Sequence, residues 1–328
     1  LATSTIGAIW SSCSPDFGTQ GLIERFSQIK PKILIITDRY YYNGKEINIL
    51  ARLPQILNKI KTIKTVLVIN YPGKKYLNQK KIKNTNLYRL NQINKIKYDQ
   101  IKFERFDFDH ELAILYSSGT TGKPKCICHR SGGVLLQHLK EHKLHCEVKP
   151  GDNVFYFTTC GWMMWNWLLT FLASKASIVL FDGFPMYKKD DLLFKIADDE
   201  KISLFGVSAK YIDQLRKINI NVKSRFKLNK LKTICSTGSP LSADNFQYVY
   251  NNIKKNVHLA SIAGGTDLVS CFVLGNIYSP VYKGQIQNNG LGMNTDVFSE
   301  KGKSLINKKG ELVCKSPFPS MPKLFWND

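Results

Sequence analysis

Short apolar runs alternate along this chain with longer segments whose apolar residues follow the spacing of a helix. Most runs are rich in β-branched residues and apolar throughout, which is typical of parallel strands covered on both faces. They span residues 32–38, 65–70, 111–117, 153–159, 176–182, 203–208, 231–238 and 257–264. Helical patterns lie at residues 22–29, 191–201, 209–218 and 242–253. So many strands exceed what one doubly wound sheet usually carries, and the pattern predicts an α/β fold with two packed, mostly parallel sheet layers.

The pattern changes near residue 275, where short strands punctuated by glycine begin. Residues 295–306 and 308–316 have the alternation typical of antiparallel hairpins. We therefore expect an α/β body over residues 1–275 and the start of a small β-rich subdomain over residues 276–328. The chain starts and stops within what look like structural elements, so we expect it to be truncated at both ends.

Two further segments bear on the organisation of the chain. Residues 74–105 are rich in Asn and Lys, which predicts a surface excursion. Residues 162–181 are the most apolar stretch, but polar residues interrupt them, which favours a buried helix followed by a buried strand over a membrane span. The chain opens at Leu1 without the basic and apolar pattern of a secretory signal. Ser242 supplies N-terminal capping chemistry, together with Asp244, for the helix predicted at residues 242–253.

The chain is strongly basic, with a formal net charge of +22. Its 47 basic residues comprise 8 arginines and 39 lysines spread along the whole length. Surfaces that bind nucleic acid usually cluster their charge and use arginine. A solvated, lysine-rich surface is therefore favoured over a role in binding nucleic acid.

The eight cysteines are scattered instead of being arranged as a disulfide framework, which favours reduced thiols in a cytoplasmic protein. Cys126, Cys128 and His129 form a CxCH pattern that could suggest zinc. No second ligand pair follows at the spacing of a zinc site, so a strand carrying two small apolar thiols is the favoured interpretation.

The stretch YSSGTTGKPK, at residues 116–125, has the composition of a phosphate-binding loop because it combines hydroxyl groups, glycines and lysines. It follows the predicted strand 111–117, and ligands of α/β sheets bind at the carboxyl ends of strands. Ser117 replaces the first glycine of a Walker A motif, and Pro124 removes a backbone donor, so this is not that motif. A flexible polar linker is the alternative. The candidate phosphate-binding residues are Ser117, Ser118, Gly119, Thr120, Thr121, Gly122, Lys123 and Lys125.

Four motifs in order resemble those of the adenylate-forming acyl-CoA synthetase superfamily. YSSGTTGKPK followed by CICHRSGG resembles its phosphate-binding signature, and STGSPL at residues 236–241 resembles its adenine-contacting loop. SIAGGTDL at residues 261–268 and KGELVC at residues 309–314 resemble its two later motifs. IWSSCSPDFG, CGWMMWNW and the GGTD form are similar to acetoacetyl-CoA synthetases, and the likeness covers essentially the whole chain.

This resemblance implies an ATP-dependent ligase that joins acetoacetate to CoA through an acyl-adenylate, with Mg²⁺. The loop from Ser117 to Lys125 would hold the β- and γ-phosphates. Thr266 would contact the α-phosphate, and Asp267 would bind Mg²⁺ where the family usually has Glu. A turn-forming aspartate is the alternative interpretation of Asp267.

The resemblance also implies sites for adenine and for the acid. Gly238, Ser239 and Pro240 would form one wall of the adenine site, with a plain strand-to-helix turn as the alternative. Trp162, Gly264 and Gly265 would line the acyl pocket, Gly264 by leaving room that a Trp fills in acetyl-CoA synthetases. Core packing is the favoured alternative for the tryptophan-rich tract as a whole. His129 could flank the phosphates or the carboxylate, although a structural role is more common for such a residue.

Two parts of the family's machinery have no match in this sequence. They are the aspartate that binds ribose and the mobile C-terminal domain, so we expect this chain alone to be incompetent for turnover. A synthetase for another short or branched acid, and a non-catalytic nucleotide- or nucleic-acid-binding protein, remain as alternatives. The sequence does not indicate an oligomeric state.

Overall fold

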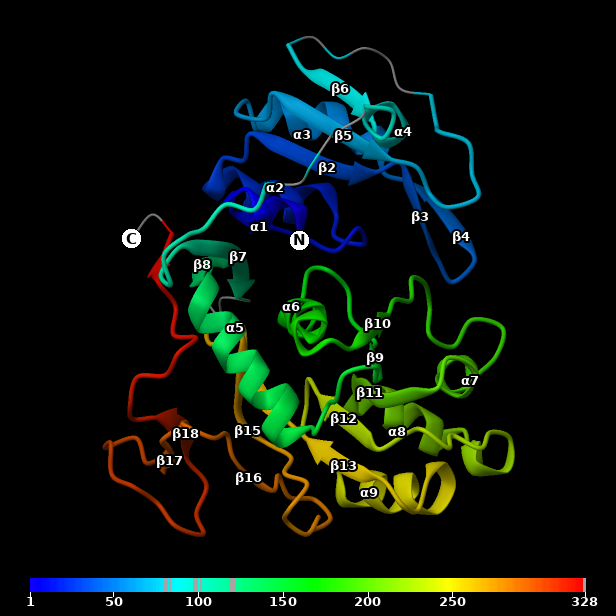
Figure 1. Cartoon of the computed structure of the whole chain (residues 1–328), viewed down its shortest axis with the longest axis vertical. Helices are drawn as coiled ribbons and strands as arrows, with labels where there is room; N and C mark the ends of the chain where they lie inside the picture. Colours follow the sequence, from blue (N-terminus) through cyan, green and yellow to red (C-terminus); the bar gives the residue numbers. More distant parts are fainter. Residues whose placement is uncertain (79–81, 83, 97–99, 101, 118–121, 327–328) are drawn as a thin grey trace. The chain divides into compact units, whose positions relative to one another are not determined.

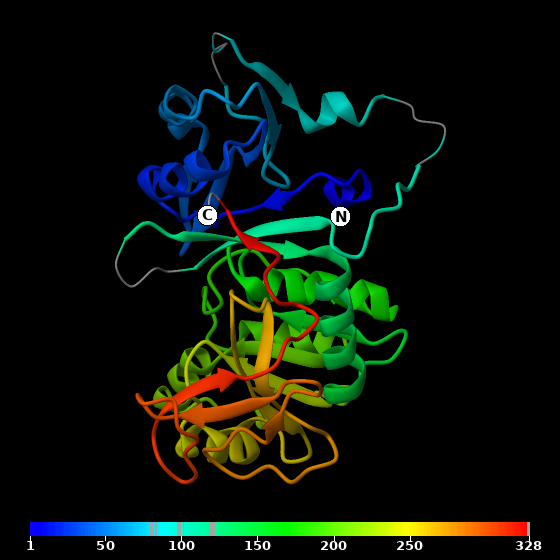
Figure 2. The same cartoon turned by 90° about the vertical axis from the view of Figure 1, so that its left-hand side faces the viewer.

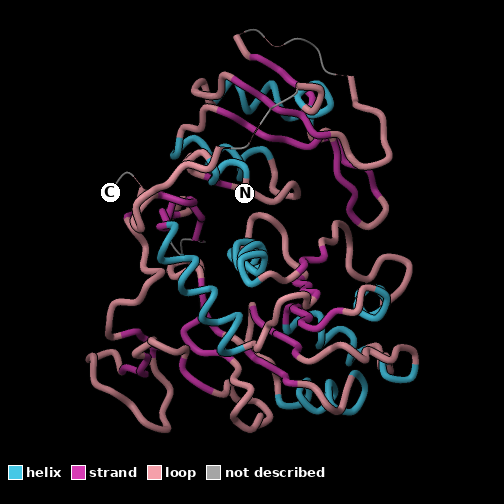
Figure 3. The backbone as a smooth tube through the Cα atoms, viewed as in Figure 1, coloured by secondary structure: helices cyan, strands magenta, loops and turns pink. Residues whose placement is uncertain are grey.

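The computed structural model describes residues 1–78, 82, 84–96, 100, 102–117 and 122–326. It divides into two compact units, one formed by residues 1–128 and 323–328 and the other by residues 129–322. Figures 1 and 3 show helices and strands alternating along both units, and the mixed α/β fold with parallel sheets is confirmed. The boundary expected near residue 275 falls inside the second unit and stays a prediction.

In its described residues, the first unit contains short helices and three sheets. Its elements are α1 (Ala2–Thr5), β1 (Trp10–Ser11), α2 (Thr19–Ile29), β2 (Ile33–Thr37), β3 (Arg39–Tyr42), β4 (Lys45–Asn48), η1 (Leu50–Arg52), α3 (Leu53–Lys59), β5 (Thr65–Ile69), β6 (Asn86–Arg89), α4 (Leu90–Ile93), β7 (Glu111–Ser117), β8 (Lys125–Arg130) and β19 (Leu324–Phe325). Strands β2, β5 and β6 form a parallel sheet, while β1, β7, β8 and β19 form another. A hairpin joins β3 to β4.

Strand β2 departs from the expectation that the strands are covered on both faces. Leu34 and Ile36 are buried against Val66 and against α3, whereas Ile33 is 61% exposed. The first four positions of this strand are apolar, but only alternate ones are buried. The segment 74–105 also differs from a simple excursion, because β6 adds a third parallel strand to the sheet.

The second unit is built on a parallel sheet of five strands in the order β10-β9-β11-β12-β13. Its elements up to the last strand of that sheet are α5 (Ser131–Lys140), the π-helical turn η2 (Glu141–His145), β9 (Asn153–Tyr156), α6 (Met163–Thr170), η3 (Phe171–Ser174), β10 (Ser177–Val179), α7 (Leu192–Asp199), β11 (Ile202–Ser208), α8 (Ala209–Lys217), η4 (Val222–Ser224), β12 (Thr233–Thr237), α9 (Ala243–Tyr248), η5 (Val249–Ile253) and β13 (His258–Ser261).

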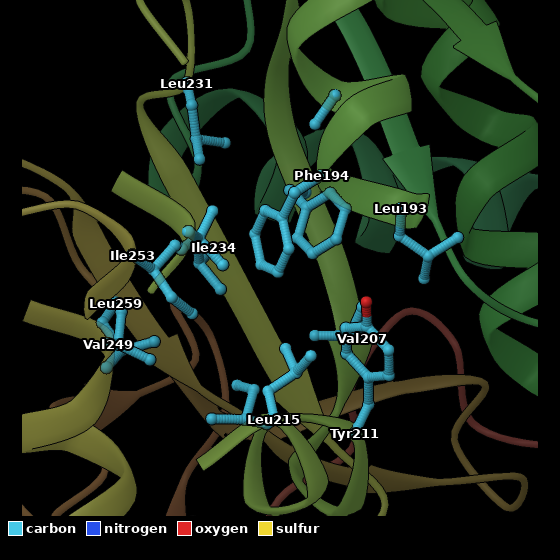
Figure 4. Packing of buried hydrophobic residues seen from close by; sticks show 14 of the residues in the cluster. Leu193, Phe194, Val207, Tyr211, Leu215, Leu231, Ile234, Val249, Ile253 and Leu259 are labelled. Carbon is cyan, nitrogen blue, oxygen red and sulfur yellow. The ribbon is translucent and has the colours of Figure 1, made fainter. Parts of the chain in front are cut away.

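Both faces of this sheet are buried, as the apolar runs predict. Phe205 and Ile234 pack with α7, α8 and α9 in one core, part of which Figure 4 shows. Their neighbours Leu204 and Cys235 point to the opposite face and pack with α6 in a second core. The helix and following strand expected within residues 162–181 are present as α6 and β10, but β10 is an edge strand without a buried residue, so the expectation of a buried strand was wrong. No helix in the described parts of the chain is long and apolar enough to cross a membrane.

Small antiparallel sheets follow the parallel sheet, as expected. They contain β14 (Ala263–Gly265), β15 (Ser270–Leu274), β16 (Asn288–Asn289), β17 (Thr295–Phe298) and β18 (Glu311–Cys314). Strands β14, β15 and β16 form one sheet, and β17 pairs with β18 in the other. Figure 2 shows β17 and β18 side by side. The hairpin predicted over residues 295–316 is thereby confirmed.

Candidate functional site

Three of the candidate motifs follow strands of the five-stranded sheet. The tryptophan-rich tract follows β9, the Gly238 loop follows β12, and the Gly264 segment follows β13. All five strands run parallel, so these three segments leave the sheet at the same edge. The carboxyl edge of a parallel sheet is where α/β proteins bind their ligands. The second unit therefore gathers the candidate adenine, metal and acid residues at an edge suited to a ligand.

The adenine-site candidates form an exposed turn between β12 and α9. Gly238 has φ of +89°, a conformation that residues with a side chain rarely adopt. Ser239 and Pro240 are exposed beside it. The Thr237 hydroxyl donates to the Ile262 carbonyl over 3.0 Å, which ties this turn to the segment that follows β13. The turn is therefore fixed next to the Gly264 segment.

The GGTD motif forms a hairpin in which β14 pairs with β15. Thr266 and Asp267 begin the turn, which ends at the buried Val269. A Cβ atom at Gly264 would come within 2.0 Å of the Ser270 carbonyl oxygen, so the neighbouring strand itself requires glycine there. This requirement is a second reason for Gly264, beside the volume argument, which stays a prediction. Gly265 has open space, with only the Asp267 carboxylate at 3.8 Å.

Asp267 presents a free carboxylate at this hairpin. Its side chain is exposed and makes no hydrogen bond or ion pair with another described residue. Mg²⁺ is commonly held by one or two carboxylates together with substrate phosphates. The uncommitted oxygen atoms of Asp267 fit that role.

His129 lies within β8 instead of after it, and its side chain is only 1% exposed. Burial lowers the pKa of His129 to about 4, although the backbone of Thr266 acts to raise it. The imidazole is therefore neutral near pH 7 and supplies no positive charge for a phosphate. The strand predicted for Cys126 and Cys128 is confirmed, and burial raises the pKa of both thiols to about 11.

The tryptophan-rich tract forms the start and body of α6. Met164 and Trp167 are buried in the second core, which confirms core packing for this part of the tract. Trp162 caps the helix and is 61% exposed. Of the tract's residues named here, Trp162 is therefore the one available to a ligand.

The candidate phosphate loop belongs to the first unit, between β7 and β8. Ser117 ends β7, and Gly122, Lys123 and Lys125 are exposed on the approach to β8. The Gln28 amide donates to the Pro124 carbonyl over 3.0 Å, which fixes the end of the loop to α2. The remaining candidates of the loop, Ser118, Gly119, Thr120 and Thr121, lie outside the described residues.

Sequence reasoning missed a row of buried polar residues on α5 and η2. Gln137, His138 and Glu141 are each 0% exposed, and they contact the turn and strand that follow Asp267. In the sequence, these three residues are spaced i, i+1 and i+4 between leucines, which places them on one face of a helix. Without the fold, nothing distinguished that row from a solvated helix face.

This arrangement is typical of α/β enzymes that bind a ligand at the carboxyl edge of a parallel sheet. The chain belongs to the family of AMP-binding enzymes, whose model matches residues 1–322. It is similar along its whole length to proteins named acetoacetyl-CoA synthetases, which confirms the resemblance seen in the motifs.

Two curated relatives and one solved structure illustrate this similarity. The chain is 48% identical to the acetoacetyl-coenzyme A synthetase of Rhizobium meliloti (strain 1021) and 45% identical to the acetoacetyl-CoA synthetase of Gallus gallus. Each comparison covers 100% of this chain and 50% of the relative, so the chain spans about half the length of these proteins. The structure of acetoacetyl-CoA synthetase from Streptomyces lividans superposes with a TM-score of 0.92 at 36% identity, over 100% of this chain and 50% of that one.

Proposed function

We propose that the chain forms part of a ligase that activates acetoacetate with ATP and transfers the acyl group to CoA. One observation carries the proposal. The Gly238 turn and the GGTD hairpin leave neighbouring parallel strands at the same edge, in a chain that is similar throughout to acetoacetyl-CoA synthetases.

The proposed reaction has two steps. In the first, a carboxylate oxygen of acetoacetate bonds to the α-phosphorus of ATP, and the bond to pyrophosphate breaks. In the second, the sulfur of CoA bonds to the acyl carbon, and AMP leaves. The protein must neutralise the triphosphate and hold the reacting atoms in line.

The nucleotide roles follow from the chemistry of the groups. The hydroxyl groups and lysines of the loop from Ser117 to Lys125 would bind the β- and γ-phosphates. The hydroxyl of Thr266 would contact the α-phosphate, and the adenine would lie against the turn of Gly238, Ser239 and Pro240. Asp267 would hold Mg²⁺, which supplies charge neutralisation to the phosphates when bound.

The acid would lie next to the GGTD hairpin. Trp162 offers an exposed aromatic face, and Gly264 and Gly265 present backbone without side chains. Such a surface leaves space for an acyl chain longer than acetate, including the keto group of acetoacetate.

ATP–pyrophosphate exchange with a panel of acids tests this proposal. The protein, made at the length of its relatives, is assayed with acetate, propionate, butyrate, a branched carboxylic acid without an amino group, and acetoacetate. We expect the highest kcat/KM with acetoacetate. Faster exchange with butyrate or propionate would reassign the acid, and no exchange with any acid would remove the ligase function.

A further inference from the structure

Glu141 is a buried carboxylate for which the proposed reaction has no role. It stands where α5 passes into the π-helical turn, and four donors point at its two oxygen atoms. Oε1 accepts from the Ser270 hydroxyl, from Gln137 Nε2 over 3.1 Å and from the Cys271 backbone N–H over 3.4 Å. Oε2 accepts from Trp167 Nε1 over 2.8 Å. The carboxylate is thus satisfied by donors from three different elements.

Burying this group is unfavourable unless its partners compensate. Burial raises the pKa of Glu141, while Lys140 and the surrounding donors act to lower it. Lys140 Nζ lies 3.9 Å from Oε1, beyond the distance of a hydrogen bond. An apolar residue would fill the same space without this cost, so the arrangement points to a role for the hydrogen bonds themselves.

Three of the four partners of Glu141 belong to two elements that adjoin candidate site residues. Trp167 lies in α6, which begins directly after Trp162. Ser270 and Cys271 begin β15, where they stand opposite Gly265 and Gly264 in the hairpin. One carboxylate therefore holds the helix that follows the acid-site tryptophan and the strand that supports the GGTD motif. Figure 1 shows α5 running beside β15.

The turn between β14 and β15 has a strained backbone. Val269 has φ of +48°, which is unfavourable for a β-branched residue. His138 Nε2, one turn before Glu141 on the same helix, donates to the Val269 carbonyl over 2.5 Å. The Ser320 hydroxyl donates to the Leu268 carbonyl over 2.6 Å. Helix α5 thus anchors both the tip and the return strand of the hairpin.

We propose that Glu141 is a positioning residue that fixes α6 relative to the Gly264–Asp267 hairpin. It thereby sets the place of Trp162 relative to Thr266 and Asp267. The inference rests on the proposed function for its effect on the acid, but the mechanical link exists whether or not the acid is acetoacetate.

Hydrogen–deuterium exchange tests the link without any assay of activity. Glu141→Gln keeps the size of the side chain but turns an NH₂ group toward donors. We expect the backbone amides of α6 and β15 to lose protection together, by roughly tenfold or more. Ser270→Ala, which removes only the hydroxyl that donates to Glu141, should loosen α6 in the same direction and shows the link if the first variant folds poorly. Glu147→Gln is the matched control, because its exposed carboxylate contacts Lys149.

The kinetics of ATP–pyrophosphate exchange then test the consequence for the proposed acid site. With the protein at the length of its relatives, Glu141→Gln should raise KM for the acid and lower kcat, together roughly 10- to 100-fold in kcat/KM. KM for ATP should rise less than KM for the acid, because Trp162 moves with α6, whereas the Gly238 turn, where adenine would lie, has no bond to Glu141. Glu147→Gln should match the unmodified protein in both constants.

The outcomes separate the two proposals. Loss of protection confined to α5 in both variants would overturn the positioning role, whatever the protein activates. Unchanged KM for the acid with loosened α6 and β15 would overturn its connection to the acid site. If the unmodified protein shows no ATP–pyrophosphate exchange with any acid, the ligase function is overturned. Hydrogen–deuterium exchange would still decide the role of Glu141.

Discussion

At the scale of single residues, Asp267 differs from Asp296 and Asp38 in having no hydrogen bond or ion pair with another described residue. Asp296, also in a hairpin, accepts from Lys315 and Ser304. Asp38 accepts from the backbone of Tyr71. An acid with bonds of this kind is committed to the fold, whereas the carboxylate of Asp267 has its full capacity available for a cation.

Replacing Asp267 therefore separates function from stability. Asp267→Asn should lower ATP–pyrophosphate exchange by roughly 100-fold or more, the scale for removing one preorganised electrostatic group. The urea midpoint should stay unchanged, since the side chain is exposed and unpaired. Asp267→Glu keeps the charge and should retain most of the exchange. Equal activity of Asp267→Asn and the unmodified protein would contradict the assignment.

Asp267 could be predicted from the sequence because it stands in a short, contiguous motif. Glu141 could not, because its bonds to Ser270 and Cys271 span about 130 positions. A buried acid is recognised by what surrounds it, and those partners come from elements that only the fold brings together. Trp162 and Trp167 make the same point, since two tryptophans of one tract differ from 61% to 0% in exposure.

At the scale of elements, α9 begins at a capping residue that the sequence identifies. The Ser242 hydroxyl accepts from the Asn245 backbone N–H over 3.3 Å, which confirms the predicted cap. Asp244 lies in the first turn, where its charge meets the positive end of the helix. The helix packs Phe246 and Tyr248 into the core that also contains α7 and α8, so its start affects the stability of the unit.

Removing this cap should have a measurable effect on folding. We expect Ser242→Ala to lower the free energy of unfolding by about 1 kcal/mol, because an N–H group at the helix start loses its acceptor. Asp244→Ala should cost about 0.5 kcal/mol, since it removes a favourable charge but no capping bond. Urea denaturation of both variants measures the difference. A larger loss for Asp244→Ala would show that charge, and not the cap, dominates.

Buried strands could be predicted from the sequence, whereas more exposed strands were missed. The strands of the five-stranded sheet have apolar residues on both faces, so their pattern was unmistakable. Strand β6 carries Asn86 and Arg89 and pairs along one edge only, so its composition resembled a loop. The β3–β4 hairpin was missed although Asn43 and Gly44 have the positive φ angles of a tight hairpin turn, a signal that the sequence did contain.

At the scale of the whole molecule, buried histidines make stability depend on pH. Burial lowers the pKa of His129 and of His138 to about 4, against an unfolded value near 6.5. Burial also holds the pKa of His142 well below its usual range. Below about pH 6.5 the unfolded chain takes up protons that the folded chain excludes, so acid favours unfolding.

We therefore expect stability to fall as the pH drops from about 6.5 toward 4. Each such histidine costs about 1.4 kcal/mol per pH unit in that window. Glu141 acts in the opposite direction, because its raised pKa lets the folded form bind a proton first. Urea midpoints at pH 7, 6 and 5 measure the net slope, and His129→Gln should reduce it. A midpoint that is constant from pH 7 to pH 5 would contradict the prediction.

The close approach of β15 to Gly264 has a consequence for anyone who redesigns this enzyme. A library that randomises position 264 to change the preferred acid would mostly return unfolded or misassembled hairpins, because even a methyl group meets the Ser270 carbonyl. Gly265 has room, and Trp162 is exposed. Within the proposed acid site, variation at those two positions would change the surface offered to the acid and leave the hairpin intact.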